Sequence, residues 1–425
     1  MFATLRNAWK VDETRKRIIF TLLMLVVIRL GNSLPVPFAN MEMIGAIADM
    51  MAGSVLGLLN LVSGGGLASM SVFALGVGPY ITASIVIQLL TFAIPALEEL
   101  SKEGEDGRKK IQRITRLVGV ALAFLQAFAL VQGIFAQAFA LGGWLEKTIA
   151  ILVMVAGAQF LIWIGDLITE KGIGNGVSFI IFVGIVASIP GVVYQRIMSI
   201  IAGMLNPIVF LLIVLAVIFI TVIVVLLSEG ERKVPVQYAK RVVGRKMYGG
   251  QATHIPIKVN MSGVLPVIFA MALLSLPNTL ALLFGGGVQE FVTTWLTPSG
   301  WGGFIIQSIL KIALIILFAY FYNSIQFNAG EYSRNLQQAG GFIPGIRPGR
   351  PTTDYLNRIV QRITLIGAVI LAFLSIVPEL LSMIFNVPIQ IGGTSVIIVV
   401  GVVLEMIRTL EAQLQLRHYK GFLNR

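Results

Sequence analysis

Residues 57–94, GLLNLVSGGGLASMSVFALGVGPYITASIVIQLLTFAI, are apolar enough to enter a membrane but poorly suited to crossing it as one rod. The run Gly64–Gly66 interrupts the first part, and the run Gly76–Pro79 breaks the chain again. Glycine costs about 1 kcal/mol relative to alanine in a helix, and proline about 3 kcal/mol. A broken backbone at membrane depth is tolerated only where protein buries it or where it lines a water-filled cavity. We therefore predict a short half-helix over about 67–75 and a full helix over about 76–95; a single kinked span is the alternative.

Apolar runs of 18 or more residues recur along the rest of the chain, and each is long enough to cross a bilayer. The 425 residues are 56% hydrophobic and only 12% charged, which excludes a soluble multidomain protein. With no cysteine, the chain also has no disulfides and no thiolate metal sites. We predict an all-α polytopic membrane protein with ten transmembrane helices, at about 18–38, 76–95, 117–138, 148–168, 177–194, 207–228, 261–284, 304–328, 363–385 and 394–413.

Basic residues fall on alternate connections between these spans. On this placement, 28 of the 32 Lys and Arg residues lie on one side of the membrane. The positive-inside rule then predicts a multi-pass membrane protein with both termini in the cytoplasm. This placement accounts for the net charge of +12 without a nucleic-acid substrate. The same charges could attract anionic lipids or ribosomal RNA.

Two of the cytoplasmic connections are long and have the pattern of ordered structure. In 229–258, the segments VPVQYAKRV and ATHIPIKV predict a protruding hairpin with its turn at Gly249–Gly250. In 329–362, GGFIPGIRPGRPTTDYL predicts a fixed non-helical loop that presents Arg347 and Arg350. We interpret both connections as docking surfaces, because long ordered loops are usually functional. The alternative, that their charges only enforce topology, explains the sign of the charge but not the turn residues.

The residues needed for common enzyme chemistry are missing from the predicted spans. Both histidines, His254 and His418, lie on the cytoplasmic side, so an intramembrane Ser–His protease or zinc site is excluded. No GxxxxGK[ST] phosphate loop occurs. We predict no catalytic residue, no metal and no cofactor.

Arg29 stands out as the one ionisable residue predicted well inside a span, about 16 Å into the first helix. Such a residue is by default a candidate functional site. A snorkelling or helix-end-paired arginine is the equal alternative. The acids near spans, Asp166, Glu170, Glu379 and Glu405, are placed at span ends, so no carboxylate is predicted near the midplane.

The second predicted span carries three polar residues, Thr82, Ser84 and Gln88. Ser84 and Gln88 share one helix face at a spacing of four residues. Polar residues in membrane helices more often join helices than bind substrates. We therefore predict a helix–helix seam here, and the stronger form of this prediction is a seam that can open.

Taken together, several motifs spread over the whole chain resemble the SecY protein-conducting channel family. One motif alone would mean little, but six in family order are specific. They are SGGGLASMSVFALGVGPYITASIVIQLLT (63–91), KEGEDGRKKI (102–111), ITEKGIGNGVSFIIF (168–182), THIPIKVNMSGVLPVIFA (253–270), GGFIPGIRPGRPT (340–352) and IGGTSVIIVVGVVLE (391–405).

The resemblance implies two inverted five-helix halves, 1–195 and 196–425, around a central pore. It implies that unfolded secretory polypeptides cross the membrane through this pore and that hydrophobic segments leave sideways into lipid. It assigns about 57–75 to a re-entrant plug, a lateral gate to Thr82, Ser84 and Gln88, and a ring of aliphatic side chains to the constriction. The plug residues implied are Gly64, Gly65, Gly66, Leu67, Ala68, Ser69, Met70 and Ser71; the ring is Val77, Ile81, Val177, Ile181, Ile268 and Ile398.

The resemblance also implies partners, because the chain holds no energy source. SecA or a translating ribosome would dock on the loops at about 229–258 and 329–362, SecE would clamp the halves, and SecG would associate peripherally. The substrates would be signal-sequence-bearing polypeptides and not small molecules. The docking residues expected are Arg347, Arg350, Lys240, Arg241, Arg245 and Lys246.

Two other classes share some of these features. A secondary transporter also has inverted repeats and broken helices, but it needs a polar or ionisable site at the midplane. An ion channel would show rings of carbonyl or charged groups. The aliphatic ring expected here favours neither.

Overall fold

The computed structural model describes most of the chain. The described residues are 6, 9–51, 60, 63–139, 143–203, 205–238, 241–243, 246–248, 252–284, 286–298, 300–385 and 392–423; the side chains of 48–51, 241–243, 246–248, 252, 282–283 and 415–423 are outside the description.

Helices dominate the structure, and each of the ten predicted spans contains one. Seven helices of the described chain are long and apolar enough to cross a membrane, and an eighth would be α5 with α6, which meet at a bend of 100°. The count of ten spans therefore remains a prediction. The helices are α2 (Asp12–Ser33), α3 (Met41–Met51), α5 (Gly78–Ala93), α6 (Pro95–Lys102), α7 (Glu105–Gln132), α8 (Trp144–Lys171), α9 (Gly176–Ile201), α10 (Pro207–Glu229), α11 (Leu265–Phe284), α12 (Gly286–Trp295), α13 (Trp301–Gln326), α14 (Ala329–Gln338), α15 (Arg350–Phe385) and α16 (Gly393–Leu423).

Local sequence explains where several helices begin. Asn175 caps α9 by accepting hydrogen bonds from the N–H groups of Val177 and Ser178. Asn206 caps α10 in the same way, with proline following at the first helical position, where no N–H is needed. The predicted boundary between the halves, at residue 195, falls inside α9. The chain leaves that helix only after Ile201.

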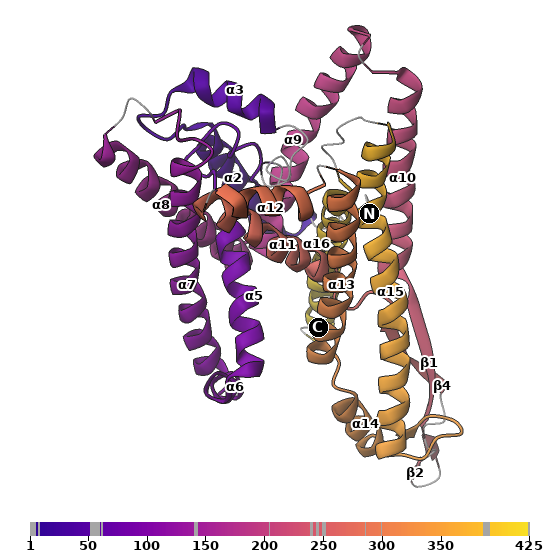
Figure 1. Ribbon diagram of the computed structural model, residues 1–425. Helices are drawn as coiled ribbons and strands as arrows, with labels where there is room; N and C mark the ends of the chain where they lie inside the picture. The colour runs from indigo at the N-terminus through magenta and orange to yellow at the C-terminus, as the bar shows by residue number, and fades with distance from the viewer. Residues whose placement is uncertain are drawn as a thin grey trace.

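Two groups of helices stand side by side in Figure 1, with α5, α7 and α8 in one and α10, α13, α15 and α16 in the other. α11 lies between them and packs against α5 and α7 on one side and against α13 and α16 on the other. A second link joins α9 to α16. The largest hydrophobic cluster contains residues of both groups, so the core of the protein lies where the two groups meet.

The half-helix predicted over about 67–75 is wrong. Residues 63–77 form a series of turns, apart from an antiparallel bridge between Ser71 and Pro35. The cause is backbone geometry. Gly64, Gly65 and Gly76 have φ between +56° and +89°, and even Met70 has φ +46°, a region that a right-handed helix does not use. The helix predicted next, over about 76–95, is confirmed as α5.

Beyond the apolar helices, the predicted hairpin is confirmed by the antiparallel pairing of β1 (Glu231–Tyr238) with β4 (Ala252–Lys258). Its predicted turn at Gly249–Gly250 lies outside the described residues. An additional small hairpin of β2 (Arg241–Val243) and β3 (Lys246–Tyr248) was not predicted. Nor was β5 (Gly341–Phe342), which joins the other side of β1 to give the sheet order β4-β1-β5. The two long connections therefore share one sheet.

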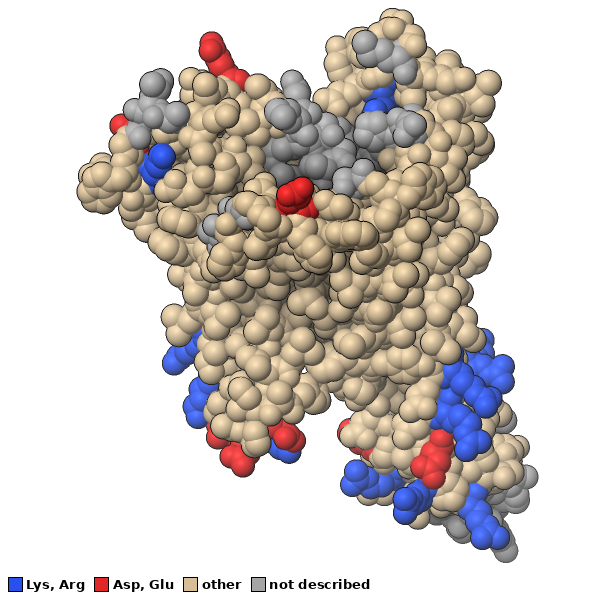
Figure 2. All heavy atoms as spheres, viewed as in Figure 1, with Lys and Arg blue, Asp and Glu red and all other residues tan. Residues whose placement is uncertain are grey.

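Positive charge gathers at one end of the molecule. Figure 2 shows Lys and Arg clustered at the lower end of the view, over the region of the sheet and α14 and around α6, with acidic residues among them. This is the end from which the connections 102–116, 229–258 and 329–362 project. Charge at the opposite end, near α3 and the tip of the α9–α10 pair, is sparse in this view.

Candidate functional site

A cavity lies where the two groups of helices meet, with an empty volume of about 1340 Å³ including its open mouth. Four isoleucines from four different helices line it, and each is almost fully buried, with 2–7% of its surface exposed. Because α5 and α9 come from the first part of the chain and α11 and α16 from the second, both parts of the chain build this apolar section of the cavity. The four are Ile81, Ile181, Ile268 and Ile398.

The remaining two predicted ring residues do not line the cavity. Val77 is buried just before α5, and Val177 is half-buried in the first turn of α9. Both pack in the same hydrophobic cluster as the four isoleucines. The spacing of four residues places each valine one helical turn from an isoleucine that does reach the cavity. The structure thus brings the six predicted residues into one core, and their role as a ring remains a prediction.

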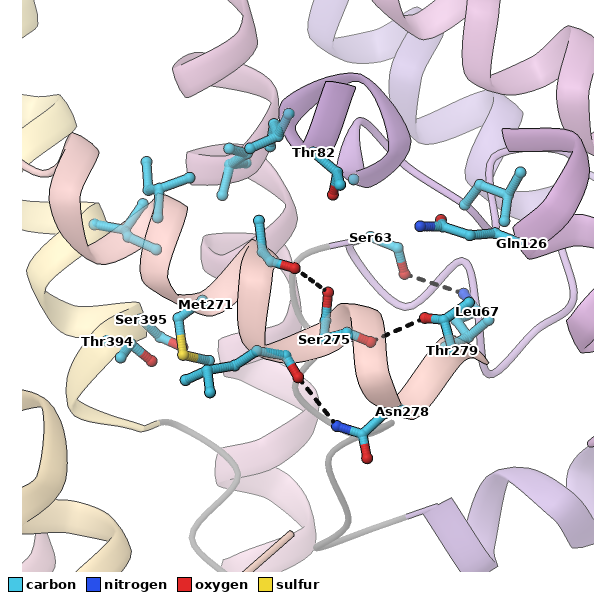
Figure 3. A pocket seen from close by; sticks show the side chains of 18 of the residues that line it. Ser63, Leu67, Thr82, Gln126, Met271, Ser275, Asn278, Thr279, Thr394 and Ser395 are labelled. Atoms are coloured by element: carbon cyan, nitrogen blue, oxygen red, sulfur yellow. Dashed lines mark hydrogen bonds between the residues drawn. The ribbon is translucent and has the colours of Figure 1, made fainter. Parts of the chain in front are cut away.

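Polar side chains form part of the cavity wall, next to further apolar ones such as Leu130 and Met271 (Figure 3). On α11, the hydroxyl groups of Ser275 and Thr279 donate to backbone carbonyls one turn back, and the Asn278 amide donates to Leu274. Their bonding needs are thus partly met within the helix, while the side chains still face the cavity. Sequence analysis missed these residues, although the cluster SLPNT in an otherwise apolar span was a signal. Other polar lining residues are Ser63, Thr82, Gln126, Gln307, Thr394 and Ser395.

The segment 63–77 covers one side of the cavity. Ser63, Leu67, Ala74 and Leu75 line it directly. Leu67, Ala74 and Leu75 also pack, together with Met70, into a cluster formed with α7 and α8. Gly157 of α8 makes room for this, since a Cβ there would lie 2.0 Å from the Val72 carbonyl oxygen. Of the predicted plug residues, Gly64 to Ser71 are all described here; residues 57–59, 61 and 62 lie outside the described chain.

A narrow seam runs between α5 and α13. The Tyr322 hydroxyl of α13 donates a hydrogen bond to Gln88 Oε1, and Gln88 Nε2 donates to Ser84 Oγ at 3.3 Å. One turn further along, the rings of Phe92 and Phe321 meet edge to face at 4.9 Å. Thr82, the third predicted seam residue, faces the cavity. At Gln88 the two helices are in contact, and a seam through Thr82, Ser84 and Gln88 that can open remains a prediction.

The structure describes only some of the predicted docking residues. Arg347 and Arg350 are exposed, beside the sheet and at the start of α15. Gly345 and Gly349, with φ +81° and +98°, shape the intervening loop, and Thr352 Oγ1 donates to the Arg347 carbonyl at 2.9 Å. The loop is non-helical over 340–349, as predicted, whereas the prediction is wrong for its last seven residues, 350–356, because they begin α15. Lys240 and Arg245 lie outside the described residues, and Arg241 and Lys246 are described only as residues of β2 and β3.

The structure contains an ion pair inside the helical body, and this pair contradicts the predicted positions of the charged residues. Lys311 of α13 is fully buried, and its Nζ lies 2.5 Å from Glu379 Oε1 of α15. Arg29 is therefore not the one ionisable residue inside a span, and Glu379 is not at a span end facing solvent. Sequence analysis missed the pair because its members are 68 residues apart and become neighbours only when α13 and α15 pack. Among the described residues, no group of three or more His, Asp or Glu is placed to hold a metal ion.

Comparisons with known proteins agree with this architecture. A family model described as SecY matches residues 71–407. The protein translocase subunit SecY of Halalkalibacterium halodurans is 44% identical over the full length of both chains. The fold is similar to a SecY structure described by its plug domain, said to stabilise the closed state and maintain a membrane seal (TM-score 0.69, 21% identity, 94% of this chain and 92% of that one). It is also similar to Sec61 in a canine ribosome-channel complex (TM-score 0.67, 19% identity, 94% and 92%).

Proposed function

The chain belongs to the SecY family of protein translocase subunits, and from that premise we propose that its central cavity is the route by which unfolded secretory polypeptides cross the plasma membrane. The observation that carries this proposal is the cavity itself, with its four isoleucines from both halves and its polar wall. An unfolded chain cannot cross hydrocarbon, because each unpaired backbone polar group costs several kcal/mol there. A hydrated, protein-lined route removes that cost.

The isoleucines serve as the seal of this route. An apolar constriction excludes ions by dewetting. Branched aliphatic side chains also close around any passing sequence, because they make no hydrogen bonds that would select one sequence over another. The polar wall holds water on one side of the constriction. Val77 and Val177 complete the ring, since each lies one helical turn from a cavity-lining isoleucine.

The turns at 63–77 serve as the plug. Their residues cover the cavity on one side and pack against α7 and α8 on the other. Positive φ at Gly64, Gly65 and Gly76 supplies flexible points at both ends of the segment. Displacement of the segment would open the cavity without disturbing a regular helix.

The α5–α13 seam serves as the lateral gate. A signal sequence presents an apolar run of about 7–15 residues, and it would enter between these two helices. The contacts described across the seam are one neutral hydrogen bond and one ring pair, which are weak enough to part. Ser84 and Gln88 lie along it, and Thr82 lies on its cavity side. Hydrophobic segments of the substrate then leave sideways into lipid.

The chain itself performs no catalysis, so a partner supplies the energy. SecA or a translating ribosome docks on the basic surface of the shared sheet, through Arg347 and Arg350 together with Lys240, Arg241, Arg245 and Lys246. The likeness to Sec61 of the ribosome-channel complex supports a ribosome-facing role for this end. SecE clamps the two halves, 1–195 and 196–425, and SecG binds peripherally. Both termini lie in the cytoplasm, where the basic loops also meet anionic lipids.

The test is site-specific crosslinking to a stalled secretory precursor. The chain has no cysteine, so single cysteines at Ile81 or Ile398 can each carry a photoreactive probe. A matched control probe goes at Leu90, which is exposed on α5 outside the cavity. We expect adducts from the two cavity positions and few from Leu90. Absence of adducts from Ile81 and Ile398, in a complex active for translocation, would sink the proposal.

A further inference from the structure

Arg29 connects α2 to the turns at 63–77. It lies near the end of α2, and its Nη1 donates a hydrogen bond of 3.2 Å to the carbonyl oxygen of Gly64. In the described part of the chain its guanidinium forms no ion pair. The sequence marked Arg29 as unusual for its depth but could not supply a partner. The structure places that partner in the glycine run.

A second polar side chain from the same helix reaches the same run. A Cβ on Gly64 would lie 3.1 Å from Asn32 Nδ2, and one on Gly66 would lie 2.9 Å from Asn32 Oδ1 and 2.7 Å from Ser71 Oγ. Asn32 Oδ1 and Ser71 Oγ are both buried with no hydrogen-bond partner. Only glycine therefore fits beside this polar clasp, which we define as Arg29 and Asn32 of α2 against Gly64, Gly66 and Ser71. Arg29, Asn32, Ser63 and Gly76 also line one small enclosed cavity.

Backbone contacts hold the neighbouring residues to the same wall. The Val36 N–H donates to the Met70 carbonyl, and the Val72 N–H donates to the Leu34 carbonyl, each at 2.9 Å. Next to them, the ring of Phe73 lies against Gly31, where a Cβ would come within 1.9 Å of the ring. α2 and the residues after it are thus the surface on which the segment rests when it covers the cavity.

The other residues around the Arg29 side chain are mostly apolar. Its exposed side opens on a groove between α2 and α9, which it lines together with seven apolar residues. A charged donor in such surroundings gains more from one carbonyl than it would in water, because the local dielectric is low. Moving Gly64 away would therefore cost more than the loss of an ordinary surface hydrogen bond.

We propose that Arg29 is a positioning residue for the plug, which sets how firmly the segment 63–77 stays in the cavity. This inference rests on the proposed function of that segment. Arg29 touches no substrate and acts through the Gly64 carbonyl. Asn32 packs beside Gly64 and Gly66, and its Oδ1 accepts no hydrogen bond.

The experiment compares Arg29→Met with Arg29→Lys, which keeps the charge and one donor, in the full channel complex reconstituted into vesicles. Lys16→Met is the matched control, because it removes one exposed charge from the same helix. One readout is ion leak through the resting channel. The other is the rate at which a membrane-impermeant maleimide modifies Ala74→Cys, a buried position that lines the cavity.

We expect Arg29→Met to raise both the leak and the modification rate roughly tenfold, equivalent to about 1.4 kcal/mol. Arg29→Lys should return both values most of the way, and Lys16→Met should leave them unchanged. If Arg29→Met cannot be recovered as folded protein, Arg29→Gln, which keeps a neutral donor, tests the same contact and should raise both values by a smaller factor.

Deletion of residues 64–71 separates this inference from the proposed function. If the deletion raises the leak and Arg29→Met leaves both readouts unchanged, the inference is overturned and the plug stands. If the deletion leaves the leak unchanged, the plug role itself fails. An Arg29→Met effect that depends on the anionic lipid content of the vesicles, and is not restored by lysine, overturns the inference in favour of a lipid contact in the α2–α9 groove.

Discussion

The two faces of α13 are held to their neighbours in different ways. Toward α5, the contacts are the hydrogen bond from Tyr322 to Gln88 and the ring pair of Phe321 and Phe92. Toward α15, the contacts include the ion pair of the fully buried Lys311 with the mostly buried Glu379, and a buried hydrogen bond from Asn323 to Thr364. The first face is neutral and partly exposed, whereas the second is charged and closed.

This difference decides which way α13 can move. Side-chain hydrogen bonds between membrane helices are worth about 0.6 kcal/mol on average. Separating a buried ion pair leaves unpaired charges in a low dielectric, which costs far more. We therefore expect α13 to part from α5 and to stay with α15 when the proposed gate opens. Three predictions test this comparison.

The largest effect is expected from breaking the charged face. Lys311→Met leaves Glu379 buried without its partner, and its second oxygen, Oε2, already lacks one. We expect a loss of about 3–5 kcal/mol in the free energy of unfolding, the usual result of removing one member of a buried pair. The measurement is the midpoint of unfolding in mixed detergent, compared with the unaltered chain.

The control for that prediction is the double variant Lys311→Met/Glu379→Leu. Replacement of both charges by apolar groups of similar size should recover most of the lost stability. A double variant as unstable as the single one would mean that packing volume, and not charge, joins α13 to α15.

A second prediction concerns the cavity, which borders the gate without belonging to either face of α13. Ile398→Asn places an amide among the four isoleucines and should let water into the constriction. We expect a several-fold gain in export of precursors with defective signal sequences, with little change in unfolding midpoint. Val369→Asn, at an exposed position of α15, is the control. Unchanged export of these precursors by Ile398→Asn would count against the seal.

The smallest effect is expected at the neutral face. Tyr322→Phe removes only the hydroxyl that bonds Gln88 and should favour the parted seam by about 0.6 kcal/mol, or less than threefold. The measurement is the yield of a disulfide between cysteines introduced at Phe92 and Phe321, whose formation requires a closed seam. Tyr320→Phe, which removes a hydroxyl that donates to the Gln361 carbonyl of α15 and does not touch the seam, should leave that yield unchanged. If Tyr322→Phe changed the free energy of seam closure, derived from this yield, by as much as Lys311→Met changes the free energy of unfolding, the two faces of α13 would not differ in strength.

Periodic and local features could be predicted from the sequence. Long apolar runs located the helices, alternation located β1 and β4, and the Gly–Pro break located the start of α5. Each of these predictions needs only residues that are near one another in the chain.

Features that depend on packing could not be predicted. The partner of Lys311 lies on another helix, and β5 meets β1 only because two distant loops come together. The prediction of a half-helix over about 67–75 failed for a related reason. Apolar composition favoured a helix, but hydrogen bonds to residues 34 and 36 gave the backbone a different set of partners.

The shared sheet has a consequence for how the chain tolerates a cut. The chain between β1 and β4 contains β2 and β3, while β5 belongs to a segment about a hundred residues after β1. The sheet and its small hydrophobic core bring both loops together without relying on a continuous backbone. We expect that two separately made pieces, divided between β2 and β3, would find each other and assemble into one working molecule.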